Sequence, residues 1–158
     1  MGHQSKIQKC LTVAEIDIIR RSYLTVGAEN ARAGELFYQH LFQNKPELRA
    51  LFVGDIAGQS SALANMLGMI VSQIQNLPEL LPMLGDLARR HIDYGVRPEH
   101  FEDVSDALIA MLQDILGPKF DSAVEAAWLK AYDGIALTMI GICFGDAGLL
   151  RYRKKTPA

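Results

Sequence analysis

One histidine stands where it could hold a metal from one side. His91 continues the apolar stripe of a predicted helix, because Ala88, Leu87 and Leu84 lie one or two helical turns before it. Gly95 is expected to end this helix in the left-handed conformation that glycine adopts readily. A histidine on an apolar face is also typical of a hydrogen-bonded core residue, so the rest of the chain must decide between the two interpretations.

Two other polar side chains interrupt apolar helix faces. Tyr38 lies on the inner face of a helix expected over residues 30–42, and Gln59 heads the apolar face of a helix expected over residues 58–77. Phe52 ends a short helix between them. Each has a plainer interpretation: Tyr38 and Phe52 as core residues, and Gln59 as an exposed first-turn residue.

The elements that must position these residues all have helical periodicity. Apolar residues recur every three or four positions, no stretch alternates with period two, and the fold class is therefore all-α. Gly34 within a helix costs about 1 kcal/mol against alanine, so a close backbone crossing is expected there, with Ser60 small enough to lie opposite. Capping boxes are expected at Thr12–Glu15 and Ser122–Glu125. Expected inward-facing residues include Val13, Leu24, Ala31 and Ile142.

Composition describes one ordinary soluble domain. The chain has 158 residues, 49% of them hydrophobic and 22% charged, with a formal net charge of -2, so nothing indicates nucleic-acid binding. We expect a flexible leader over residues 1–11, a domain over 12–146 and a solvated basic tail over 147–158. The longest weakly polar run, residues 134–145, is too short to span a bilayer.

The two cysteines, Cys10 and Cys143, lie far apart and match neither a disulfide framework nor a zinc pattern. A reduced, cytoplasmic setting is the simplest expectation, although a bridge would form if the leader reached the last helix.

The order of Tyr38, Phe52, Gln59 and His91 resembles that of bacterial haemoglobins, that is, the globin domain of flavohaemoglobins and their single-domain relatives. The resemblance covers about residues 11–144. Its most specific segments are FYQHLFQNKPELRALF (37–52), NLPELLP (76–82), ARRHIDYGVRPEHF (88–101) and AAWLKAY (126–132). It implies the globin fold, a three-over-three helical sandwich, with a short loop after Phe52 in place of the fourth helix.

The resemblance also implies a haem cofactor, haem b, and assigns roles around it. His91 matches the proximal ligand of the iron, Tyr38 and Gln59 match distal residues that stabilise a bound gas, and Phe52 matches the phenylalanine on the haem face. One imidazole on ferrous haem leaves the sixth position free for oxygen, nitric oxide or carbon monoxide. The other residues implied to pack on the haem are Leu63, Leu67, Leu87, Val96, Phe101 and Val104.

The implied function is high-affinity reversible oxygen binding, which supports oxygen supply or nitric oxide dioxygenation. No flavin reductase domain is expected within the chain, so turnover would need a separate reductase, and whether the protein is an enzyme stays open. Two alternatives remain. The protein could be a haem-based gas or redox sensor acting through a partner, or a globin-fold interaction module without haem.

The chain departs from flavohaemoglobins on the proximal side. Phe101 stands where they have a tyrosine, and Gly145, with Asp146 next to it, stands where they have a glutamate. Without that carboxylate, the ring N–H of His91 is expected to donate to a backbone carbonyl of its own helix, which disfavours peroxidase-like bond cleavage. The remaining helical histidines, His40 and His100, are expected on the surface near the cavity without a ligand role.

Overall fold

The computed structural model describes residues 11–52, 56–93 and 95–155, with side chains except at 77–78 and 150–155. The described residues form helices and contain no strand, which confirms the all-α expectation. The α-helices are α2 (Val13–Ala28), α3 (Asn30–Asn44), α4 (Ile56–Ser72), α5 (Leu81–Asp93), α6 (His100–Leu116) and α7 (Ser122–Lys155); the 3-10 helices are η1 (Pro46–Leu51), η2 (Ile74–Leu80) and η3 (Gly117–Lys119).

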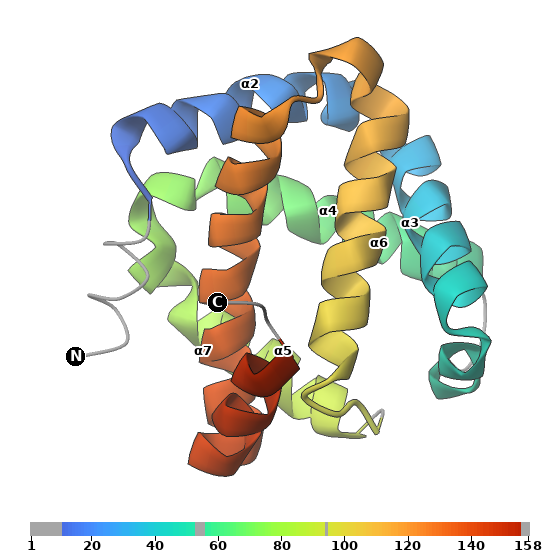
Figure 1. Ribbon diagram of the computed structural model, residues 1–158, viewed down its shortest axis with the longest axis vertical. Coiled ribbons are helices and arrows are strands. Elements are labelled where there is room, and N and C mark those ends of the chain that lie inside the picture. Colours follow the sequence, from blue (N-terminus) through green and yellow to red (C-terminus); the bar gives the residue numbers. More distant parts are fainter. Residues whose placement is uncertain (1–10, 53–55, 94, 156–158) are drawn as a thin grey trace.

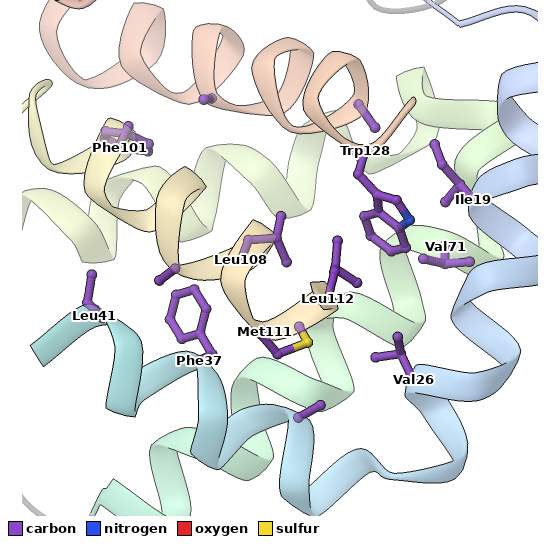
Figure 2. Packing of buried hydrophobic residues seen from close by; sticks show 14 of the residues in the cluster. Ile19, Val26, Phe37, Leu41, Val71, Phe101, Leu108, Met111, Leu112 and Trp128 are labelled. Carbon is purple, nitrogen blue, oxygen red and sulfur yellow. The ribbon is translucent and has the colours of Figure 1, made fainter. Parts of the chain in front are cut away.

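The helices cross in two layers around one core. α6 and α7 stand side by side, and α4 runs across behind them (Figure 1). α3 packs against both α4 and α6, while α5 packs against α7. Each fully buried aliphatic or aromatic side chain contributes about 1.5–3 kcal/mol relative to exposure. Figure 2 shows the interior, where the buried side chains include Phe37, Leu41, Leu108, Met111, Leu112 and Trp128.

Gly34 sets how closely α3 and α4 approach each other. A Cβ atom built on Gly34 would lie 2.4 Å from the carbonyl oxygen of Ser60 and 2.8 Å from its carbonyl carbon. This confirms the close crossing and the facing Ser60 predicted from the sequence. Because α3 carries Tyr38 and α4 carries Gln59, the crossing fixes the separation of two helices that bear predicted site residues.

One of the two expected capping boxes forms. At the start of α2 the backbone N–H of Thr12 donates to Glu15 Oε1 at 2.9 Å, and the N–H of Glu15 donates to Thr12 Oγ1 at 3.1 Å. At α7 the expected Ser122–Glu125 box is wrong, because Asp121 takes the capping position. Its Oδ1 accepts the N–H of Val124 at 2.9 Å.

Several residues expected to face inward are exposed. Val13 is 85% exposed, Leu24 76% and Ile142 45%, and Ala31 is also exposed. The helix expected over residues 58–77 is also shorter, because α4 ends at Ser72 and η2 follows. The N–H of Gln73 is shared between the carbonyls of Met69 and Ile70, which tightens the last turn into 3-10 geometry.

α7 continues further than the sequence indicated. Residues up to Lys155 are helical, although a basic tail was expected from residue 147. Gly145 interrupts the helix with φ 64° and ψ -156°, a conformation open mainly to glycine. Gly148 then packs against Phe144 and Ile140, so the chain after the kink folds back along the helix that precedes it (Figure 1).

The stretch Ser122–Leu149 of α7 is long and apolar enough, by length and composition alone, to cross a membrane. Its mean hydropathy is 1.3 over an 18-residue window, of which 39% is buried. Trp128, Met139 and Ile140 from this stretch all lie in the core. Packing inside the domain therefore accounts for the apolar character of the helix.

Candidate functional site

A cavity of about 320 Å³ lies between the helices and is lined mainly by aliphatic and aromatic side chains. This volume falls within the range of small-molecule and cofactor pockets. The structure brings every residue that the sequence predicted for the site to this cavity, namely Tyr38, Phe52, Gln59, Leu63, Leu67, Leu87, His91, Val96, Phe101 and Val104.

His91 reaches the cavity from the last turn of α5. Its Nδ1 donates to the carbonyl oxygen of Leu87, one turn earlier, at 2.7 Å. This confirms the expectation of a backbone partner in its own helix. A carbonyl can only accept, so Nδ1 carries the proton and the lone pair of the neutral ring is on Nε2. Burial lowers the pKa of His91, and the bond to Leu87 opposes that effect.

The turn after α5 follows the predicted pattern. Gly95 has a φ of 83° and its N–H donates to the carbonyl of Ile92, while the N–H of Val96 donates to the carbonyl of His91. These bonds close the end of the helix and place Val96 at the cavity wall. Pro98 precedes the first residue of α6 by two positions.

The proximal ring is supported by aromatic packing. The rings of His91 and Phe101 lie 6.1 Å apart between centroids, with an interplanar angle of 26°. Tyr132 of α7 also lines the cavity, and its hydroxyl donates to the carbonyl oxygen of Phe101 at 2.5 Å. Sequence reasoning did not assign Tyr132 a role at the site. Gly145 and Asp146, which replace the glutamate of flavohaemoglobins, are exposed.

Tyr38 is held in an aromatic cluster. Its ring lies 5.0 Å from Phe37 and 5.3 Å from Phe52, both edge to face, and stacks on Phe42 at 5.7 Å. Such contacts each contribute about 0.5–1.5 kcal/mol beyond area burial. Three rings from different directions therefore fix the plane of the Tyr38 phenol, which is only 7% exposed.

Gln59 reaches the cavity from the first turn of α4. Leu63 and Leu67 follow it at four-residue intervals, so all three lie on one helix face. Gln59 is half-buried, which excludes the plainer interpretation of a fully exposed residue. One polar amide thus heads an otherwise apolar wall.

Two basic residues at the cavity were missed. Arg90, which is exposed, and His100, which is half-buried, both line it, and the sequence assigned neither a role there. His40 does lie outside the cavity, where its Nε2 is 2.6 Å from Asp114 Oδ2 and joins α3 to α6. The position of Arg90 directly before His91 was the one available signal, because consecutive helical residues at a helix end can border the same opening.

Other candidate ligands are few. Within the described ranges no three histidine, cysteine or acidic side chains gather where they could hold a metal ion. Cys143 places its Sγ 3.0 Å from the carbonyl oxygen of Ala88, to which it donates. The pairing of Cys143 with Cys10 lies outside the described residues, and so does the expected leader apart from Leu11.

Comparison with known proteins identifies the fold and the family. The model of the Globin family matches residues 35–139, which is more than half of the chain. A flavohemoprotein of Rhizobium meliloti is 29% identical over 135 residues, 84% of this chain but 34% of that protein. The chain therefore spans about a third of the length of the flavohemoproteins it matches. A globin-like protein of Aquifex aeolicus is 34% identical over 103 residues, 65% of this chain and 73% of that protein.

Solved structures agree with this fold. The bacterial globin of Campylobacter jejuni superimposes with a TM-score of 0.72 at 28% identity, over 84% of this chain and 96% of that one. An engineered carbene transferase made from a candidate nitric oxide dioxygenase of Rhodothermus marinus gives a TM-score of 0.79 at 23% identity, over 89% of this chain and 99% of that one. At 23% identity, the match to the engineered carbene transferase supports the fold alone.

Proposed function

Because the chain belongs to the globin family, we propose that it holds haem b in the cavity with His91 as the protein ligand of the iron, and that it binds oxygen reversibly. Family membership and the flavohemoprotein relatives imply haem binding. The observation that carries the proposal is the neutral imidazole of His91, oriented by Leu87 at the wall of an apolar cavity.

The residues present fit a haem group. A metal ion bound by protein alone usually needs three or four ligands, whereas haem iron needs one axial residue because the porphyrin supplies the rest. His91 is such a single ligand, and the described part of the chain offers no cluster that would hold a bare ion. Aliphatic and aromatic walls suit the faces of a porphyrin. The two cysteines lie far apart, so the chain contains no C-x-x-C-H motif, and haem b is the appropriate form.

When bound, haem iron supplies an open coordination position for a diatomic gas. The protein contributes the hydrogen-bond donors around that position. Tyr38 donates through its hydroxyl and Gln59 through its side-chain amide, and both act in a cavity whose other walls are largely apolar. Donors in such surroundings favour ligands that carry partial negative charge, so oxygen gains more than carbon monoxide.

We further propose that the bound oxygen can be used to convert nitric oxide to nitrate. The net reaction joins one nitric oxide with one oxygen molecule and consumes one electron, so each cycle needs a reductase. The flavohemoprotein relatives, whose name denotes a flavin together with a haem, support electron supply to a haem of this kind. Oxygen supply is the second use of the same oxygen-binding site.

The test is the oxygen dissociation rate of the reduced protein, measured by stopped flow. Replacing both donors by Tyr38→Phe and Gln59→Leu should raise the rate by well over tenfold, since each charge-assisted bond contributes roughly 1.5–3 kcal/mol. Leu67→Val, which lines the cavity without a donor, is the matched control. An unchanged rate in the double variant would refute the distal role. Nitrate formation on mixing the oxygenated protein with nitric oxide tests the dioxygenase activity.

A further inference from the structure

The basic residues of the chain are concentrated at the end of α7. Four of its 16 lysines and arginines occupy positions 151–155, whereas none of its 18 acidic residues follows Asp146. The 12 remaining basic residues are set against all 18 acidic ones, so residues 1–150 have a formal net charge of -6. Such a separation of charge favours association of the basic end with an acidic partner.

The fold holds this basic end against the domain. After the kink at Gly145, residues 146–155 are helical and fold back along the part of α7 that precedes the kink (Figure 1). Gly148 is buried against Phe144 and Ile140. In the helical register, positions 151, 154 and 155 are three and four residues apart, which places three of the four basic residues on one face. The positive charges thus belong to an ordered surface of the fold.

The basic end also lies near the helix that carries the proposed iron ligand. α7 packs against α5, and Cys143, two residues before the kink, donates from Sγ to the carbonyl oxygen of Ala88 at 3.0 Å. Ala88 lies three residues before His91. Arg151 is six residues beyond Gly145, and a helix of that length extends only about 9 Å. The positive charges therefore stay on the side of the domain where α5 meets α7.

The proposed reaction indicates the class of partner. Each cycle of nitric oxide conversion consumes one electron, which a separate donor must bring to the haem. Complexes of electron-transfer proteins are small and transient, and complementary charges raise their association rate without burying a large area. A compact group of four positive charges suits a contact of this kind.

An anionic membrane is the competing partner, and two observations disfavour it. A helix that lies on a bilayer inserts an apolar face, but Gly148 is buried and Leu149 packs against Gly141, so apolar residues of this segment are already used inside the domain. A bilayer would also extend past the basic end and face the remainder of the chain, whose net charge is negative. A small acidic protein can contact the basic end alone.

We propose that residues 146–155, which contain the four basic residues, form the docking surface for an acidic electron-transfer protein that reduces the haem. In this step the ferric iron gains the one electron that the donor loses, and no covalent bond forms or breaks. The inference rests on the proposed haem function and adds to it the surface through which the electron donor binds.

The experiment uses reduced flavodoxin, a small acidic flavoprotein, as the probe. Anaerobic stopped flow measures the rate at which it reduces the ferric, hemin-loaded protein at low and high ionic strength. For wild type the rate should fall as salt is added. The double variant Lys154→Glu with Lys155→Glu should react at least about tenfold more slowly at low salt, the lower end of what electrostatic steering supplies, and should lose the salt dependence.

The control variant combines Lys45→Glu with Lys119→Glu. It changes the net charge by the same amount at two exposed residues on other elements, α3's C-terminal cap and η3. Its rate with flavodoxin should stay close to that of wild type. Free reduced riboflavin, which has no acidic protein surface, should reduce all three proteins at the same rate.

An unchanged flavodoxin rate in the Lys154→Glu, Lys155→Glu variant, or an equal slowing in the control variant, overturns the docking surface. Sedimentation of wild type, but not of that variant, with phosphatidylglycerol vesicles, together with an unchanged flavodoxin rate, would assign the basic end to a membrane instead. A wild-type protein that takes up no hemin, or whose haem riboflavin cannot reduce, overturns the proposed function itself, and this inference with it.

Discussion

The crossing of α3 and α4 can be tested by the substitution Gly34→Ala. The new Cβ would lie 2.4 Å from the carbonyl oxygen of Ser60, whereas ordinary contacts begin near 3.4 Å, so one helix must move by about 1 Å. The obstacle is main chain and has no rotamer to change. Overpacking of this kind costs roughly 3 kcal/mol, the upper part of the usual range. The higher helix propensity of alanine offsets about 1 kcal/mol of this cost.

We therefore expect Gly34→Ala to lower the free energy of unfolding by about 2 kcal/mol, which corresponds to about 4–8 °C in Tm for a domain of this size. Gly134→Ala is the control, because Gly134 lies inside α7 and no atom is within 4 Å of its built Cβ. Gly134→Ala should raise the free energy of unfolding by about 1 kcal/mol, because alanine has the higher helix propensity. Thermal unfolding of the three proteins measures both effects. Ser60→Gly should not rescue Gly34→Ala, since it leaves the carbonyl in place, and a Gly34→Ala protein as stable as wild type would refute the close crossing.

Two further substitutions test buried and charged contacts. Ser60→Ala should raise the free energy of unfolding by about 1 kcal/mol, because Ser60 Oγ is buried without a hydrogen-bond partner in the described part of the chain; a destabilised variant would contradict this. Hydrogen bonds from Lys130 and Thr12 lower the pKa of Glu15, so its contribution to stability is full above the ordinary carboxyl pKa and is lost as the pH falls through the lowered value. Between neutral and acid pH, the free energy of unfolding measured in urea should fall less for Glu15→Gln than for wild type. An equal fall in the two proteins would exclude this contribution.

Sequence reasoning located the parts of the site that local patterns determine. His91 could be placed because its helix face and the glycine at position 95 both lie within a few residues of it. The bond from His91 to Leu87 follows from the same local geometry. Gly34 was informative because a glycine inside a helix needs a packing reason.

Other features depended on tertiary contacts that periodicity does not contain. The exposure of Val13 and Leu24 depends on which residues of α2 the neighbouring helices cover, and only Ile19 and Val26 of that helix are buried. Asp121 and Ser122 are both good capping residues, and the pattern could not rank them. His100 is the first residue of α6 and lines the cavity where Glu47 of η1 lies near its ring, and this placement is set by the tertiary fold rather than by helical periodicity.

The most direct test of the account is the absorption spectrum of the ferrous protein after reconstitution with hemin, compared for wild type, His91→Gly and His40→Gly. Wild type and His40→Gly should both show the Soret band of a five-coordinate histidine-ligated haem. His91→Gly should lose that spectrum, and added imidazole should restore it by entering the space left by the side chain. A His91→Gly protein with an unaltered ferrous spectrum would contradict the assignment of His91 as the ligand of the iron.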